Sequence, residues 1–216
     1  MKTPIFTGAA TALITPFRNR EIDYEAFGTL IDNQLNAGID ALVICGTTGE
    51  ASTLTDDEQI SAIEFAVKRV AGKVPVIAGA GSNDTEHAIR LCRRSCEVGA
   101  DALLIVTPYY NKTSQRGLIH MYTRIADSVD KPIILYNVPS RTGVNIEPET
   151  YAALADHPNI NAIKECVFHI FVTRNMRKQS ELYLRIVGVD YKIFVVLGNE
   201  IFSESSAKLG LYRYIL

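Results

Sequence analysis

Short apolar runs alternate along the chain with longer segments in which apolar residues recur every three or four positions. The short runs predict β-strands and the longer segments predict amphipathic helices, because these are the periodicities of the two structures. The predicted strands lie at residues 11–14, 41–45, 76–80, 102–106, 133–136 and 162–164. The predicted helices lie at residues 24–37, 56–70, 85–98, 115–128 and 148–156.

Polar residues mark the starts of two of these helices. Thr55 and Glu58 have the spacing of a capping box, and Asn83 or Asp84 suits the N-cap of the next helix. Strand and helix therefore follow each other with little linker between them, which is typical of parallel βα units.

Two architectures share this alternation, a doubly wound open sheet and a (β/α)8 barrel. A dinucleotide-binding open sheet carries GxGxxG after its first strand, whereas this chain has Gly79-Ala80-Gly81 after the third. Polar motifs instead follow several different strands, and a barrel assembles its active site from such loops. We therefore expect an α/β fold of the (β/α)8 TIM barrel type, with residues 1–216 as a single domain.

Composition narrows the possible partners and the compartment. The formal net charge of -2 provides no basic stripe, so we expect neither a nucleic acid nor a membrane as partner. Pro and Gly interrupt the apolar N-terminus, and no run approaches the roughly 18 apolar residues of a spanning helix, which favours a cytoplasmic protein. The cysteines lack zinc-ribbon spacing, so we interpret them as reduced thiols and expect no metal site; they are Cys45, Cys92, Cys96 and Cys166.

The motif GTTGE follows the second predicted strand, at residues 46–50. The glycine Gly46 lets the backbone approach a ligand, and the amides and hydroxyls of Thr47 and Thr48 can hold a small carboxylate. The same residues are also ordinary turn and N-cap residues, so this motif alone leaves both interpretations open.

Further polar side chains follow the fourth and fifth predicted strands. Tyr109 and Tyr110 can pack at an interface as readily as take part in chemistry. Tyr136 offers a phenolic proton donor, and Arg141 offers a planar fork for a carboxylate.

Lys164 belongs to the last predicted strand, where an inward ammonium group is costly. Burial disfavours the charged form, so more of the side chain becomes the free amine that attacks a carbonyl to form a Schiff base. A lone lysine at a strand end is more simply explained by a salt bridge with Glu165. The tyrosine, threonines and arginine expected on the same face favour the catalytic interpretation.

Four motifs occur in the order GTTGE (46–50), PYYNK (108–112), YNVPSRTG (136–143) and IKE (163–165). In this order they resemble the 4-hydroxy-tetrahydrodipicolinate synthase (dihydrodipicolinate synthase) family of the pyruvate-dependent class I aldolases, over roughly residues 1–165. The resemblance implies a lyase of lysine (diaminopimelate) biosynthesis that condenses pyruvate with L-aspartate-4-semialdehyde. It also implies a homo-oligomer, a dimer or tetramer, and no cofactor beyond the covalent Schiff base with pyruvate.

The resemblance also implies roles for individual residues. Lys164 would form the Schiff base and Tyr136 would relay protons. Thr47 and Tyr110 would complete the relay, with Tyr110 lent by the neighbouring subunit.

Substrate binding is implied in the same way. Thr48, with Gly46 beside it in the turn, would bind the carboxylate of pyruvate. Arg141 would bind the carboxylate of the incoming semialdehyde.

After Glu165 the sequence departs from the family pattern, because residues 166–173 are apolar and strand-like where the family has a small residue and a glycine turn. Residues 196–200 and 209–215 echo the seventh and eighth strands, which puts Gly198 and Ile215 at pocket-lining positions. The family's C-terminal helical region has no counterpart. We therefore expect a barrel that is C-terminally truncated or divergent after the sixth strand.

Two alternatives stay open at this point. N-acetylneuraminate lyase shares the fold, the lysine and the tyrosine, although the two threonines and Arg141 favour the synthase. A catalytically inactive remnant is the other alternative. Turnover with pyruvate and aspartate-semialdehyde distinguishes all three.

Feedback inhibition by lysine is expected to be weak or absent. Asn83, Glu86 and Tyr109 resemble positions that contact the inhibitor in the family. Asp56 and Gln59, however, stand where sensitive members often have histidines.

Overall fold

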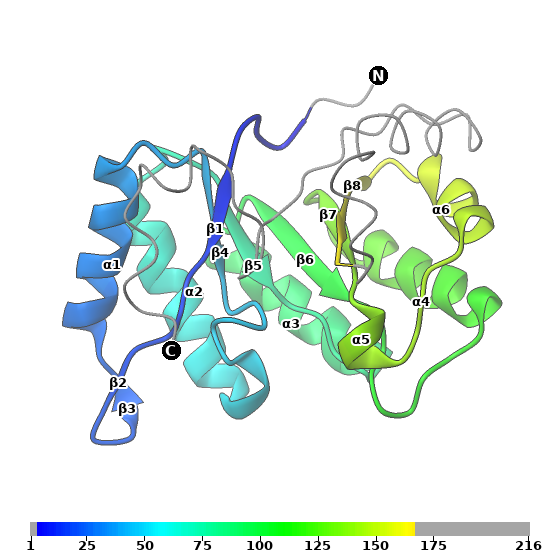
Figure 1. Ribbon diagram of the computed structural model, residues 1–216, viewed down its shortest axis with the longest axis horizontal. Helices are drawn as coiled ribbons and strands as arrows, with labels where there is room; N and C mark the ends of the chain where they lie inside the picture. Colours follow the sequence, from blue (N-terminus) through cyan, green and yellow to red (C-terminus); the bar gives the residue numbers. More distant parts are fainter. Residues whose placement is uncertain (1–3, 167–216) are drawn as a thin grey trace.

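Six parallel strands form one curved sheet in the computed structural model, which describes residues 4–166 of the chain (Figure 1). The strands lie in the order β1-β4-β5-β6-β7-β8. Their bounds are β1 Ala10–Ala12, β4 Ala41–Ile44, β5 Val76–Gly79, β6 Ala102–Val106, β7 Ile133–Asn137 and β8 Ile160–Glu165. This order follows the chain, as in a barrel, whereas the order reverses in a doubly wound sheet.

Helices connect successive strands and lie along the outside of the sheet (Figure 1). Their bounds are α1 Tyr24–Asn36, α2 Asp56–Val70, α3 Thr85–Glu97, α4 Gln115–Asp127, α5 Pro139–Thr142 and α6 Pro148–Ala155, with a 3-10 turn at Ala51–Thr53. The Thr55–Glu58 capping box at the start of α2 is confirmed, and Asp84 is the N-cap of α3. Among residues 4–166, none of the helices combines the length and the apolar character needed to cross a bilayer.

Alternate strand residues face two separate apolar layers, because successive side chains of a strand point to opposite faces. Leu42 and Ile44 of β4 pack with helix residues such as Phe27. Val43, between them, packs in a second cluster with Ile77 and Leu104 on the other face. Both faces of the sheet therefore carry buried apolar side chains, as is typical of parallel sheets.

The structure corrects the predicted elements mainly at the start of the chain. Strand β1 ends at Ala12, whereas the sequence predicted a strand to residue 14; Ile14 is 49% exposed. Beyond it the chain turns into a hairpin of two-residue strands, β2 (Phe17–Arg18) and β3 (Glu21–Ile22), which sequence reasoning did not predict. The short helix α5 was also missed. The expectations for residues 167–216, including two further strands, lie outside the described residues.

Candidate active site

Lys164 lies opposite Tyr136 at the carboxyl ends of the neighbouring strands β8 and β7. The Lys164 side chain is 5% exposed, and its Nζ lies 4.4 Å from the centroid of the Tyr136 ring. Desolvation lowers the pKa of Lys164, and the nearby Cys166 thiol offsets part of this effect. More of the lysine is therefore the neutral amine at a given pH, which is the form that attacks a carbonyl.

Tyr136 connects the lysine to the turn after β4. Burial raises the pKa of Tyr136, and the nearby Thr47 side chain offsets part of that rise. The structure thus brings together three residues that the sequence predicted to act together, Lys164, Tyr136 and Thr47. A phenol close to a hydroxyl can exchange a proton with it once the two are hydrogen-bonded.

The turn that carries the threonines has an unusual backbone. Cys45, directly after β4, has a φ of 54°, a conformation that residues other than glycine rarely adopt. A Cβ on Gly79 of β5 would lie only 2.1 Å from the Cys45 carbonyl oxygen, so the neighbouring strand must carry a glycine there. The Thr15 hydroxyl donates to the Gly49 carbonyl oxygen at 2.7 Å and fixes the end of the turn.

The two predicted substrate-binding residues of this turn lie beside Thr47. Gly46 is buried, and Thr48 is half-buried. A Cβ on Gly46 would meet only the Val43 side chain within 4 Å, at 3.4 Å, so the space at this position is largely open.

Arg141 is exposed on α5, just past the end of β7. Its charge reaches the site, because it lowers the pKa of both Tyr136 and Cys166. Helix α5 is held by buried hydroxyls, since Thr107 donates to the Thr142 hydroxyl at 3.0 Å. The guanidinium group therefore stands at the rim of the site, where a carboxylate can reach it.

Tyr110 is the predicted catalytic residue that the described chain does not bring to the site. Its side chain is 93% exposed, and its φ of 67° lies in the left-handed region. Its loop is tied down on both sides, because Asn111 Nδ2 donates to the Asn83 carbonyl at 3.0 Å and Asn83 Nδ2 donates to the Tyr109 carbonyl at 3.3 Å. Gly198 and Ile215, predicted to line the pocket, lie outside the described residues.

Cys166 is a site residue that sequence reasoning missed as such. Burial raises the pKa of its thiol, while the nearby Lys164, Tyr136 and Arg141 side chains each act to lower it. The sequence contained a signal for this placement, because residues two apart on a strand point to the same face. Cys166 is therefore expected on the same face as Lys164.

Asn137 and Glu165 form a second cross-strand pair, directly after Tyr136 and Lys164. Asn137 Nδ2 donates to Glu165 Oε1 at 2.5 Å, and Tyr151 of α6 donates to Glu165 Oε2 at 2.7 Å. The predicted alternative of a Lys164–Glu165 salt bridge is not among the ion pairs of residues 4–166, because adjacent strand residues point to opposite faces.

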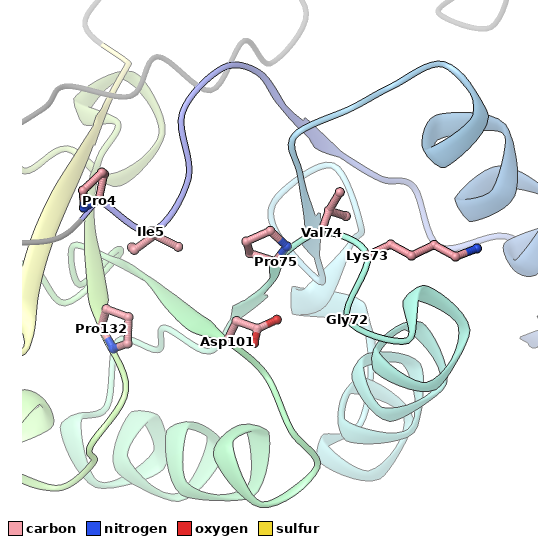
Figure 2. Close-up of a pocket in the computed structure, with 8 residues that line it drawn as sticks. All are labelled: Pro4, Ile5, Gly72, Lys73, Val74, Pro75, Asp101 and Pro132. Atoms are coloured by element: carbon pink, nitrogen blue, oxygen red, sulfur yellow. The ribbon is translucent and has the colours of Figure 1, made fainter.

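Within residues 4–166, neither a candidate metal site nor the cavity shown in Figure 2 coincides with this cluster. Residues 4–166 contain no group of three or more His, Cys, Asp or Glu side chains placed to hold a metal ion. A cavity of about 370 Å³ lies where the chain enters strands β5, β6 and β7 (Figure 2). Lys164 lies near the opposite end of the sheet, at the carboxyl end of β8. Its lining includes Pro4, Pro75 and Pro132, together with Asp101, whose carboxylate accepts from the Val76 amide at 2.8 Å. We assign it no part in the chemistry.

Comparison with known proteins identifies close relatives. The sequence model of the dihydrodipicolinate synthetase family matches residues 5–200, which runs past the four motifs. The 4-hydroxy-tetrahydrodipicolinate synthase of Acetivibrio thermocellus is 56% identical over 166 residues, which are 77% of this chain and 57% of the relative. The chain thus spans little more than half the length of that relative.

Two solved structures show the same fold. Dihydrodipicolinate synthase from Aquifex aeolicus matches with a TM-score of 0.80 and 46% identity, over 87% of this chain and 62% of that one. The chloride-inhibited dihydrodipicolinate synthase of Acinetobacter baumannii, complexed with pyruvate, matches with a TM-score of 0.80 and 35% identity, over 87% and 62% of the two chains. The predicted α/β barrel class is confirmed by these matches.

Proposed function

Because the chain belongs to the dihydrodipicolinate synthetase family, we propose that it condenses pyruvate with L-aspartate-4-semialdehyde to form 4-hydroxy-tetrahydrodipicolinate, in lysine (diaminopimelate) biosynthesis. The observation that carries the proposal is the buried amine of Lys164 against the Tyr136 ring, at the carboxyl ends of two parallel strands. These strand ends are where barrel enzymes assemble their chemistry.

The first step uses the lowered pKa of Lys164. The neutral amine attacks the ketone carbon of pyruvate, a carbon–nitrogen bond forms, and the oxygen leaves as water. The protonated imine then withdraws electrons from the neighbouring carbon, so that loss of a methyl proton gives an enamine. The chemistry requires no metal or organic cofactor, because the imine itself is the electron sink.

Proton transfer is the task of Tyr136, Thr47 and Tyr110. Tyr136 is close enough to serve both the imine and Thr47. We assign Tyr110 to the site of a neighbouring subunit, in a homo-oligomer, which is supported by its 93% exposure on a fixed loop.

The two substrates each present a carboxylate. We assign the pyruvate carboxylate to the turn of Gly46 and Thr48, and that of the semialdehyde to Arg141, since a fixed guanidinium fork suits a carboxylate. The enamine carbon attacks the aldehyde to form a carbon–carbon bond. The amino group of the second substrate then displaces Lys164 from the imine, which closes the ring and frees the enzyme.

The proposal covers residues 1–216 as a single (β/α)8 domain of a cytoplasmic enzyme. The absence of any metal or organic cofactor remains part of the proposal.

Borohydride trapping tests the assignment of Lys164. Incubation with pyruvate and borohydride should add one reduced pyruvate, which peptide mass spectrometry should locate on Lys164. Lys164→Ala should abolish the adduct, whereas Lys73→Ala, an exposed lysine, should retain it. A chain without an adduct, or with the adduct on another lysine, contradicts the proposal.

Arg141→Ala tests the division between the two substrates. The variant should keep the pyruvate adduct, because the arginine is assigned to the second carboxylate. Condensation with aspartate-semialdehyde should fall by about a hundredfold, the cost of losing a charge-assisted contact. Loss of trapping in this variant would place Arg141 on pyruvate instead.

A further inference from the structure

Two cross-strand pairs lie next to each other at the ends of β7 and β8. Tyr136 and Lys164 are one pair, and Asn137 and Glu165 are the next. Because side chains alternate along a strand, the first pair faces the chemistry and the second faces the surrounding helices. The second pair is also joined by a side-chain hydrogen bond, from Asn137 Nδ2 to Glu165 Oε1 at 2.5 Å.

Further bonds anchor the second pair to the segment that follows β7. Asn137 Nδ2 also donates to Asn145 Oδ1 at 2.8 Å, and Asn137 Oδ1 accepts from the Ile146 amide at 3.2 Å. Glu165 Oε2 accepts from the Tyr151 hydroxyl of α6 at 2.7 Å. The carboxylate therefore ties both strand ends to one helix of the outer layer.

The Glu165 carboxylate has no cation as partner among the ion pairs of residues 4–166. Burial raises its pKa, and the bonds from Tyr151 and Asn137 act against this rise. A buried carboxylate held by neutral donors is a poor source of stability. It does, however, accept strong and directional hydrogen bonds.

We propose that Glu165 is a positioning residue, which fixes the distance between Lys164 and Tyr136 by joining Asn137 and Tyr151 through its two oxygens. The inference rests on the proposed function, because Lys164 and Tyr136 are the reacting pair there. Tyr136 directly precedes Asn137 in the sequence, and Lys164 directly precedes Glu165. A shift of the Asn137–Glu165 pair therefore also moves the Tyr136–Lys164 pair. Catalytic groups tolerate only about 0.5 Å of such displacement.

Glu165→Leu and Glu165→Gln test this role together. Leucine keeps most of the volume but accepts no hydrogen bond. Glutamine can still accept from Asn137 through its oxygen, while its amino group donates to the Tyr151 hydroxyl. Glu149→Gln is the matched control, because Glu149 is an exposed carboxylate in the first turn of α6.

The first measurement is the rate of borohydride trapping as a function of pyruvate concentration. At saturating pyruvate, Glu165→Leu should react at least about tenfold more slowly, the scale expected for misplaced reacting groups. The half-saturating concentration should stay unchanged, because the pyruvate carboxylate is assigned to the turn after β4. Glu165→Gln should restore the rate to within about threefold of the wild type, since it retains both contacts.

The second measurement is amide hydrogen exchange without substrate. The amides of Cys166 and Ile146 donate to the backbone and side-chain oxygens of Asn137, at 2.8 and 3.2 Å. Both should exchange at least about tenfold faster in Glu165→Leu and at the wild-type rate in Glu165→Gln. Should the leucine variant fail to fold, Tyr151→Phe removes one of the two contacts and should slow trapping severalfold with the same half-saturating concentration.

The outcomes separate this inference from the proposed function. A leucine variant with wild-type trapping and exchange overturns the inference, as does a glutamine variant as slow as leucine, which would mean that the charge itself acts. Wild-type protein without an adduct overturns the proposed function, and the exchange rates then still decide whether Glu165 holds these strand ends.

Discussion

Lys164 is a buried cation without a carboxylate partner among the ion pairs of the described residues. Desolvation opposes its charged form, and the ring of Tyr136 supplies only a cation–π contact. Such a residue lowers the stability of the fold while it makes the amine reactive. Catalytic residues commonly show this conflict between stability and activity.

Lys164→Met should therefore stabilise the protein and abolish pyruvate trapping. The gain at pH 7 should be about 1 kcal/mol, the usual scale for relieving such a residue. The pKa of Lys164 in the folded protein lies below its ordinary value of 10.5, so between these two values the unfolded chain binds more protons than the folded one. The stability of the wild type therefore falls as the pH drops from 10.5 towards the folded-state pKa. The advantage of methionine should consequently shrink as the pH rises to 10.5. Urea unfolding at several pH values measures the difference in stability between the variant and the wild type, and Lys73→Met is the control at an exposed lysine. A Lys164→Met variant that is less stable than the wild type at pH 7 would contradict the argument.

Among the secondary-structure elements, β4 and β5 approach each other unusually closely at the turn of the threonines. The left-handed conformation of Cys45 directs its carbonyl oxygen to Gly79. The turn can hold this shape only while β5 has no side chain at that position.

Gly79→Ala should destabilise the fold by about 2 to 3 kcal/mol, the usual cost of forcing atoms into a packed region. The added Cβ would lie 2.1 Å from a backbone oxygen, which cannot rotate away as a side chain can. Gly28→Ala on α1 is the control, since its Cβ would meet side-chain atoms no closer than 3.5 Å. That change should stabilise α1 by about 0.5 to 1 kcal/mol. Equal unfolding midpoints for the two variants in urea would rule out the close approach.

The elements differ in how well the sequence predicts them. Helix α2 and strand β6 have the predicted bounds, because a capping box starts the one and a continuous buried run defines the other. The β2–β3 hairpin has two-residue strands, which are too short to show any periodicity. Helix α5 is a single turn after Pro139, which the pattern gives no reason to separate from the loop.

The site was predictable to the extent that it depends on strand ends. Lys164, Tyr136 and Thr47 meet because parallel strands finish at one edge of the sheet. The bonds from Asn137 and Tyr151 to Glu165 could not be read in advance, since they depend on how α6 packs against β8. The left-handed backbone at Cys45 likewise has no signal in the residue itself.

For the whole molecule, the loop with Tyr110 is the part of the candidate site whose predicted residue lies exposed at the surface. Its side chain is 93% exposed, although the loop is hydrogen-bonded at Asn83 and Asn111. A large aromatic side chain that is exposed on a hydrogen-bonded loop suits a contact across a twofold axis.

Assembly and activity should therefore depend on each other. We expect at least a dimer in sedimentation, and Tyr110→Phe should lower turnover by about tenfold or more, because the proposed proton relay would lose its hydroxyl. Tyr24→Phe, on the outer helix α1, should keep full turnover. A fully active monomer would refute the shared relay.

The order of the strands also has a consequence for biosynthesis on the ribosome. From β4 to β8, each strand of the sheet pairs with the sheet strand that comes before it in the sequence. None of these pairings therefore has to wait for a distant segment to be translated. The nascent polypeptide can add one βα unit after another as it emerges. The Tyr136–Lys164 pair then forms with the last of the described strands, so the reactive amine becomes buried only after the scaffold around it has been built.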